Sequence, residues 1–429
     1  LDLGRNPPHA NDWAEVETLT LRDGSKIDGA FQRQSPGRFR PLRGAVRSIA
    51  DSDIVKREKR YYVSFPPLPA VLMLPFVAAF GHRLNDVLFT VLLAGFVPAL
   101  FFLLLRRLPR GPTQDPDADA VRPLVPDLWM TGLLAFGTVF YFSSILGQVW
   151  YTAHIVSLVL AALYFHAALG AQYPFLVGLC LGALMLTRPQ MVFLGTFFLF
   201  ESARLGTNDG RYPLRPSLWP KMPDRLGPPL RSVLTAAAPL LLLAAAGFAY
   251  NYARFRNPLE FGHSFLTTQQ ADNIQRYGLF NYHYLSRNLS AAFTLLPRIL
   301  PRPPFLQISY HGVSLLLTTP VLCYLLWPEP PTPGDTHTPA LRRVLWLTLL
   351  PVAAFSFLYQ NDGYIQFGFR FSLDYLLPLL MLLALGNPRA VAGWRFRGLI
   401  LCGVVVNLFG AITFGRMWQF YWNGFFPVG

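Results

Sequence analysis

Long apolar runs alternate with polar, charged loops along most of this chain. The clearest runs cover residues 87–105, 128–146, 152–169, 233–250, 341–358 and 399–414. Each is close to the ~20 residues that cross a ~30 Å hydrocarbon layer as a helix. Backbone amides in lipid must be paired internally, and the sequence lacks the alternating ten-residue pattern of a membrane barrel. With weaker runs included, the sequence predicts an all-α, polytopic membrane bundle of about ten transmembrane helices.

The composition agrees with a membrane protein, since 52% of the residues are hydrophobic and the mean hydropathy is +0.34. The net charge of +14 is carried almost wholly by arginines that are not concentrated in one soluble module, so it does not indicate a nucleic-acid partner. Cys180, Cys323 and Cys402 lie in apolar runs. We expect them to be small buried hydrophobes rather than disulfide or metal ligands.

Short basic loops predict the orientation, because loops rich in arginine and lysine stay in the cytoplasm. Four groups of arginines are placed inside by this rule: Arg106, Arg107, Arg110 and Arg122; those of 204–231; Arg342 and Arg343; and Arg389, Arg395 and Arg397. The connections 147–151, 251–310 and 360–370 then lie outside. Two short crossings, 176–186 and 191–200, must turn on the outer side.

A proline-rich segment, 66–82, is too short and too interrupted to span, and we expect a juxtamembrane helix at the interface. The predicted organisation is therefore an outer, periplasmic region over 1–65, this juxtamembrane helix, and a bundle over 83–429 with an outer loop at 251–310. The chain opens at Leu1 without a methionine, and we expect either an N-terminally truncated chain that has lost its first transmembrane helix or a processed chain.

Polar residues gather where the predicted helices meet the outer face. Tyr151 and His154 begin one helix, and Arg188 lies between the two short crossings. Arg254 and Glu260 follow another apolar run. Walker, dinucleotide-glycine, HExxH and GxSxG motifs are missing from the sequence, which excludes the corresponding soluble enzyme classes.

Arg370 and Asp374 stand at the outer start of a late apolar run. Their i, i+4 spacing predicts a shared helix face and a mutual ion pair. Ionisable groups at membrane depth are costly and suggest function, whereas anchoring in the headgroup layer is the structural alternative.

Four segments, in order along the chain, resemble motifs of one enzyme superfamily. They are Arg60-Tyr-Tyr-Val-Ser-Phe-Pro-Pro, Leu186-Thr-Arg-Pro-Gln190, Asn251-Tyr-Ala-Arg-Phe-Arg-Asn-Pro-Leu-Glu-Phe-Gly262, and Gln366-Phe-Gly-Phe-Arg-Phe371 followed by Pro378. They are similar to motifs of the polyprenyl-phosphate-dependent glycosyltransferases of the GT-C superfamily, which include protein mannosyltransferases and aminoarabinose transferases. One departure is Ser64-Phe65, where relatives of the aminoarabinose transferase often carry a lysine.

The resemblance implies inverting sugar transfer from a polyprenyl-phosphate donor to a glycan, lipid or protein acceptor, at the outer face of the cytoplasmic (inner) membrane of a bacterium. The candidates for binding the donor phosphate or the substrate are Arg370, Asp374, Arg188, Arg254, Tyr62, Tyr151, His154 and Glu260. Arginines bind phosphate in bidentate fashion, and a carboxylate must deprotonate the acceptor hydroxyl. The superfamily's catalytic aspartate would lie upstream of Leu1, so Asp12 is the candidate left in this chain. This reading requires no metal or cofactor.

Two other functions remain open from the sequence. One is a flippase or transporter of lipid-linked saccharides, and the other is a polymerase or ligase of surface polysaccharide. A transporter should carry polar residues near the bilayer midplane. The outer position of the polar residues in this chain favours the transferase.

Overall fold

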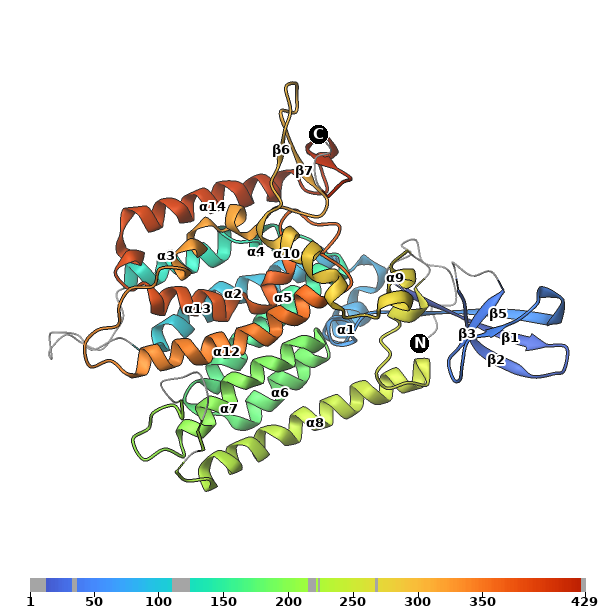
Figure 1. Ribbon diagram of the computed structural model, residues 1–429, viewed down its shortest axis with the longest axis horizontal. Coiled ribbons are helices and arrows are strands. Elements are labelled where there is room, and N and C mark those ends of the chain that lie inside the picture. Colours follow the sequence, from blue (N-terminus) through green and yellow to red (C-terminus); the bar gives the residue numbers. More distant parts are fainter. Residues whose placement is uncertain are drawn as a thin grey trace. The chain divides into compact units, whose positions relative to one another are not determined.

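The computed structural model describes residues 13–32, 37–109, 124–214, 221–222, 224–266 and 269–425 (Figure 1). The chain forms two compact units. The mixed unit consists of Leu1–Pro67, Leu242–Leu285 and Leu358–Asn361. The helical unit consists of Leu68–Leu241, Ser286–Phe357 and Asp362–Gly429.

The mixed unit contains a five-stranded antiparallel sheet. Its strands are β1 (Trp13–Leu21), β2 (Lys26–Phe31), β3 (Arg38–Pro41), β4 (Arg47–Ser48) and β5 (Ile54–Val63), in the order β4-β3-β2-β1-β5. Lys59 of β5 forms an ion pair of 2.5 Å with Glu15 of the neighbouring β1. A small apolar core is formed by Leu19, Phe39 and Ile49. The expectation of an all-α chain is therefore wrong.

The mixed unit also includes the last part of α8 (Gly227–Phe255) and the short helix α9 (Gln269–Tyr277). Phe255, which ends α8, packs edge-on against Tyr62 of β5 at a centroid distance of 5.6 Å. It also stacks on Phe265 at 5.8 Å. These rings fix the end of α8 to the sheet within this unit.

The helical unit holds most of the remaining helices. They are α1 (Leu68–Phe80), α2 (Asp86–Arg107), α3 (Leu124–Phe136), α4 (Phe140–Ser144), α5 (Val149–Ala168), α6 (Pro174–Met185), α7 (Gly195–Arg204), the first part of α8, α10 (Leu285–Phe293), α11 (Leu315–Thr318), α12 (His337–Leu358), α13 (Leu376–Gly386) and α14 (Trp394–Thr413). Three short strands, β6 (Arg298–Ile299), β7 (Leu306–Ser309) and β8 (Tyr421–Trp422), form a second sheet.

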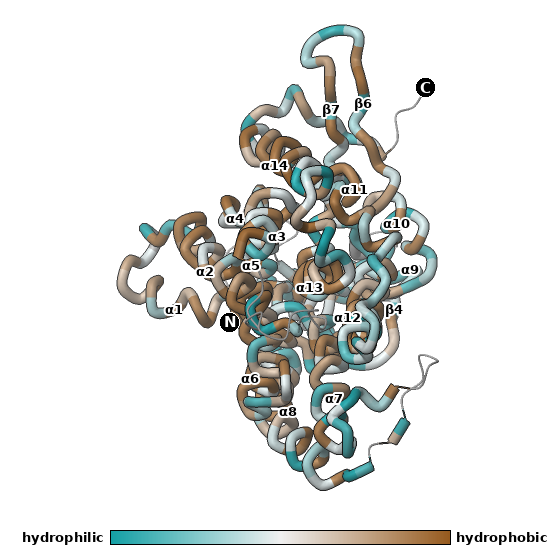
Figure 2. The backbone as a smooth tube through the Cα atoms, turned by 90° about the vertical axis from the view of Figure 1, so that its left-hand side faces the viewer, coloured by the Kyte–Doolittle hydropathy of each residue, from teal (hydrophilic) through white to brown (hydrophobic). Residues whose placement is uncertain are grey.

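Five of these helices are long and apolar enough to cross a membrane: α2, α5 with its extension to Ala171, α8, α12 and α14. They indicate a multi-pass membrane protein, and Figure 2 shows the hydrophobic character of helices such as α2 and α14. The prediction of about ten spans is wrong for the described residues. One reason is α13, whose 11 residues are all buried, so its apolar run serves the protein interior. Another is Gly137, where the run 128–146 is broken between α3 and α4.

The helices of this unit have an arginine-rich end and an opposite end. Helices α2 and α5 run parallel, because Thr90 contacts Thr152 near their starts (2.7 Å) and Arg107 donates to the His166 carbonyl near their ends (2.5 Å). Three further arginines lie at the Arg107 end. Arg106 donates a hydrogen bond to Asp127 at the start of α3, and Arg397 lies over the Trp129 ring of the same helix. Arg342 lies next to Gly386 at the end of α13. We call this the arginine-rich end and the other the site end.

Helix α1 begins and ends at the site end. The Leu68 amide donates to the Leu186 carbonyl beyond the end of α6 (3.1 Å). A 3-10 turn, Gly81–Arg83, then leads directly to Asn85, which caps the start of α2. Large apolar side chains such as Leu74 and Phe80 are exposed along α1. This path supports the predicted interfacial helix, which stays a prediction because no membrane is present.

Candidate functional site

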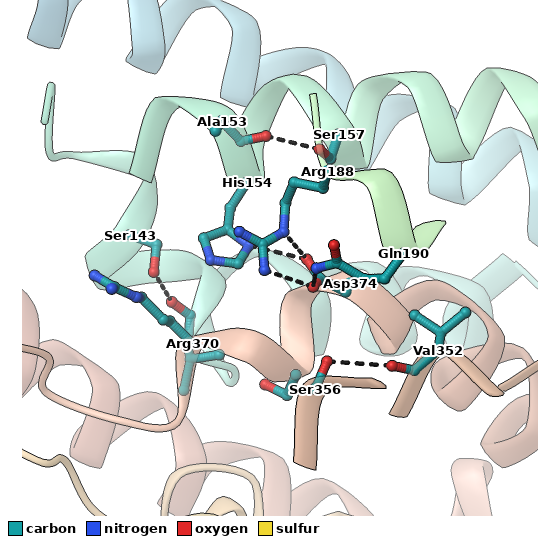
Figure 3. A network of polar contacts seen from close by, with 12 residues as sticks. Ser143, Ala153, His154, Ser157, Arg188, Gln190, Val352, Ser356, Arg370 and Asp374 are labelled. Carbon is teal, nitrogen blue, oxygen red and sulfur yellow. Dashed lines mark hydrogen bonds and ion pairs between the residues drawn. The ribbon is translucent and has the colours of Figure 1, made fainter. Parts of the chain in front are cut away.

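A buried network of charged and polar side chains centres on Asp374 (Figure 3). Arg188 binds both carboxylate oxygens, with Nε 2.6 Å from Oδ1 and Nη2 2.7 Å from Oδ2. Gln190 donates to Oδ2 at 2.7 Å, and His154 donates to Oδ1 through Nδ1 at 3.1 Å. The Asp374 and His154 side chains are fully buried. We call His154, Arg188, Gln190 and Asp374 the Asp374 cluster.

Three separate segments bring this cluster together. His154 is in the first turns of α5, and Arg188 and Gln190 flank Pro189, which starts the 3-10 helix Pro189–Leu194 after α6. Asp374 is in the 3-10 helix Arg370–Tyr375 before α13. Proline suits the first position of a helix because it has no amide hydrogen to donate. Pro189 thus ends the extended backbone at Arg188 and starts the turn that carries Gln190.

Arg188 and His154 compensate the negative charge of the buried Asp374 carboxylate. Burial raises the pKa of Asp374, but the charge of Arg188 and the hydrogen bond from His154 lower it more, so the pKa lies below its ordinary value. The remaining His154 nitrogen, Nε2, is buried and has no hydrogen-bond partner among the described residues.

Arg370 lies beside this cluster, and three aromatic rings pack against its guanidinium. Its guanidinium carbon is 5.2 Å from the Tyr151 ring centroid, 5.8 Å from that of Trp150 and 5.6 Å from that of Phe371. Arg188 lies over the same Phe371 ring at 5.3 Å. Cation–π contacts of this kind stabilise a guanidinium that is removed from water. Phe371 therefore contacts both arginines.

The expected ion pair between Arg370 and Asp374 is not the arrangement observed. The segment that contains them is a 3-10 helix, in which residues three apart eclipse each other, so an i, i+4 pair does not share a face. Asp374 is instead paired with Arg188, and Figure 3 shows the side chains of Arg370 and Asp374 extending in different directions.

The cluster lies near the site end of the helices and not at their middle. His154 is the sixth residue of α5, which places it about 7.5 Å from the helix start at ~1.5 Å per residue. Arg188 follows the end of α6, and Arg370 and Asp374 precede α13. The structure thus brings together five predicted residues: Tyr151, His154, Arg188, Arg370 and Asp374.

The other candidates are in the mixed unit. Arg254 donates to the Val63 carbonyl (2.5 Å) and to Asn251 Oδ1 (2.7 Å), and its guanidinium lies 4.8 Å from the Phe255 ring that Tyr62 also contacts. Glu260 accepts the backbone amide of Gly262 (2.7 Å), which is a local loop contact. Asp12 lies outside the described residues.

Two glutamines in the site were not among the predicted candidates. Gln190 is in the turn motif Leu186–Gln190, in which the charge of Arg188 is the chemical signal that a sequence offers. Gln366 accepts the Arg370 amide through Oε1 at 2.9 Å and so fixes the start of the 3-10 helix. Neutral amides carry no signal of their own in a single sequence. Among the described residues, no three His, Cys, Asp or Glu side chains are grouped so that they could hold a metal ion.

No protein-family model, no curated protein and no solved structure matches this chain. The resemblance to GT-C glycosyltransferases therefore stays a prediction that depends on the sequence motifs and on the geometry of the site.

Proposed function

We propose that this protein is a membrane glycosyltransferase that transfers a sugar, with inversion, from a polyprenyl-phosphate donor to an acceptor at the outer face of a bacterial cytoplasmic membrane. The observation that carries the proposal is the position of Arg188 and Arg370 around one aromatic ring at the site end of membrane-length helices.

The charges of the site suit the donor. Arg188, Arg370 and Asp374 carry two positive charges and one negative charge, which leaves a formal excess of one positive charge. A polyprenyl-phosphate sugar is a phosphodiester with a single negative charge. Guanidinium groups stay protonated and offer planar pairs of donors that match phosphate oxygens. In this account Arg370 contacts the phosphate, while Arg188 mainly holds Asp374.

The location of the site suits a lipid-linked substrate. The arginine-rich end is expected on the cytoplasmic side, which puts the site end on the outer side. There the phosphate can lie at the membrane boundary while the isoprenoid chain stays among apolar side chains. Exposed apolar residues of α1, such as Leu74 and Phe76, supply a surface of this kind next to the site end.

The remaining candidate residues have roles in substrate binding in this proposal. His154 Nε2 accepts a hydrogen bond from a sugar hydroxyl, and the Tyr151 ring supports the Arg370 guanidinium that binds the phosphate. Tyr62, Arg254 and Glu260 of the mixed unit stay substrate-binding candidates, and Asp12 a candidate base, on the sequence motifs alone. Glycan, lipid and protein acceptors are all compatible with these groups. Arginine contacts neutralise the phosphate, so the proposed reaction proceeds without a metal ion.

The main competitor is a flippase or transporter for the same kind of lipid. A transporter needs its ionisable groups near the midplane and on a path to both sides. The Asp374 cluster lies instead at the site end, where Asp374 contacts His154 in the first turns of α5, and this position favours the transferase.

The two functions give different products with the same probe. The purified full-length protein is reconstituted in liposomes with a C55 polyprenyl phosphate that carries one labelled hexose, and peptides, oligosaccharides and glycolipids are offered as acceptors. Release of polyprenyl phosphate together with a labelled acceptor is the expected result. Movement of the intact donor between leaflets, with the sugar–phosphate bond unbroken, would contradict the transferase and favour the transporter.

A further inference from the structure

A second group of titratable side chains in the helical unit lies outside the Asp374 cluster. His311 Nδ1 is 2.7 Å from Asp362 Oδ2, and Arg287 Nε is 3.4 Å from the same oxygen. The Asp362 side chain is only 2% exposed, whereas His311 is 20% and Arg287 37% exposed. A buried carboxylate thus supports an imidazole that reaches the surface.

The carboxylate of Asp362 is held rigidly. Its Oδ1 accepts the Tyr364 amide at 3.1 Å. The Gln366 side-chain amide donates to the carbonyls of His311 (2.7 Å) and Asp362 (2.8 Å), so the two residues are also linked through their backbones. This geometry keeps the imidazole in one orientation relative to the carboxylate.

The protonation state of the pair follows from its electrostatics. Burial raises the pKa of Asp362, but the hydrogen bond and charge of His311 and the charge of Arg287 lower it more, so the carboxyl is ionised at neutral pH. An ionised carboxylate can only accept, and Nδ1 of a neutral His311 must then carry the proton. Nε2 consequently presents a lone pair, as in hydrolases whose histidine is oriented by an aspartate.

Aromatic rings lie next to His311. The ring centroids of Tyr364 and Phe425 both lie 5.0 Å from that of the imidazole. Tyr310, the residue before His311, stacks on Tyr421 at a centroid distance of 5.6 Å. Tyrosine faces pair an apolar surface with a polar hydroxyl, which suits a sugar or another hydroxyl-bearing acceptor.

Hydrogen bonds connect this pair to the donor site. Gln366, which clamps His311 and Asp362, also accepts the Arg370 amide at 2.9 Å. The Tyr151 hydroxyl donates to the Ile365 carbonyl at 3.0 Å. The segment after α12 therefore supplies Asp362 and the Gln366 side chain, which links His311 to the backbone of the arginine proposed to bind the phosphate.

We propose that His311, in place of the carboxylate of Asp12 expected from the sequence, is the general base that activates the acceptor hydroxyl, and that Asp362 is its positioning residue. This inference rests on the proposed function. His311 Nε2 takes the hydroxyl proton as the acceptor oxygen bonds to the anomeric carbon. The bond from that carbon to the phosphate oxygen breaks, and the electron pair leaves with polyprenyl phosphate. The titratable or charged groups that face the imidazole are Tyr364 and Asp362, together with Arg287, which acts through Asp362.

The test measures release of polyprenyl phosphate from the C55 polyprenyl-phosphate hexose by the reconstituted full-length protein between pH 5 and 9. Wild-type kcat/KM should fall toward acid pH, because a protonated imidazole cannot accept a proton. His311→Gln should lower kcat by about 10²- to 10⁴-fold, leave KM for the donor nearly unchanged and remove the acid limb. Asp362→Asn should lower kcat while keeping the acid limb. The control His337→Gln, at the arginine-rich end, should match wild type.

Each outcome bears on one claim. A wild-type protein that releases no polyprenyl phosphate contradicts the transferase itself. An active wild type whose kcat/KM is flat from pH 5 to 8 overturns the role of His311, and this holds even if the variants fail to fold. A folded His311→Gln protein with kcat within threefold of wild type, or with the acid limb intact, also overturns it.

Discussion

Arg188 and Asp374 form a two-contact ion pair although 186 positions separate them in the chain, with Nε 2.6 Å from Oδ1 and Nη2 2.7 Å from Oδ2. The pair joins the turn after α6 to the start of α13; Asp374 is fully buried with His154, and the Arg188 side chain is 15% exposed. It therefore ties together the segments that carry the proposed donor site.

Removing one partner of this pair should be strongly destabilising, because the other is left as an uncompensated buried charge. Asp374→Ala is expected to cost about 3–5 kcal/mol of stability. The double variant Arg188→Met/Asp374→Leu should be less destabilised than the single variants Arg188→Met and Asp374→Leu. Thermal unfolding of the detergent-solubilised protein measures both, and additive losses in the double variant would contradict a coupled pair.

Helices α6 and α8 approach so closely that Gly178 admits no side chain. A Cβ at Gly178 would overlap the backbone carbonyl of Ala236, which cannot rotate away, whereas a Cβ at Gly132 of α3 meets nothing within 4 Å. Gly178→Ala should destabilise by about 1–3 kcal/mol through forced separation of the helices. The matched Gly132→Ala should be neutral or stabilising by up to ~1 kcal/mol. Equal melting temperatures for the two variants would refute this packing.

The path of α1 predicts which positions face the same side of the membrane. In a background without Cys180, Cys323 and Cys402, cysteines at the exposed positions Ser52 and Arg83 should both react with an impermeant thiol reagent from the outside. A cysteine at the exposed Arg389 should react only after permeabilisation. Reaction of Arg83→Cys from the Arg389 side would mean that α1 crosses the membrane.

Asp362 should make stability depend on pH in the acidic range. Its pKa in the folded protein lies below the ordinary 3.8, because His311 and Arg287 outweigh the effect of burial. The folded state therefore binds this proton less readily than the unfolded state, and the contribution is present above about pH 4 and lost as the pH falls through the folded pKa. The difference in melting temperature between wild type and Asp362→Asn should shrink from pH 6 to pH 3. A constant difference would contradict this assignment.

The long helices could be predicted from the sequence because continuous apolar runs such as 87–105 are unambiguous, and α2 does cover Asp86–Arg107. The number of spans could not be predicted from the sequence, because hydropathy does not distinguish burial in protein from exposure to lipid. Leu376–Gly386 is as apolar as a span but is wholly buried. The sheet was missed because the edge strand Ile54–Val63 is dominated by charged, exposed residues, so its alternation is weak.

The candidate site was predictable as a set of residues but not as a set of contacts. Tyr151, His154 and Arg188 stood out as polar residues at the ends of apolar runs. The partner of Asp374 could not be derived, because the local i, i+4 rule assumes an α-helix whereas the segment is a 3-10 helix. The pairing of His311 with Asp362 depends on a tertiary contact across 51 positions, for which a single sequence holds no signal.

Binding of polyprenyl phosphate is the measurement that tests the donor site most directly. Arg370→Gln removes one guanidinium without leaving the Asp374 carboxylate uncompensated, whereas Arg389→Gln removes an exposed arginine between α13 and α14 at the other end. Loss of a charged hydrogen bond costs about 1.5–3 kcal/mol, so Arg370→Gln should weaken the Kd of C55 polyprenyl phosphate by about 10- to 150-fold. Arg389→Gln should bind as wild type does. Equal affinity of the folded Arg370→Gln protein and wild type would contradict the account of the donor site.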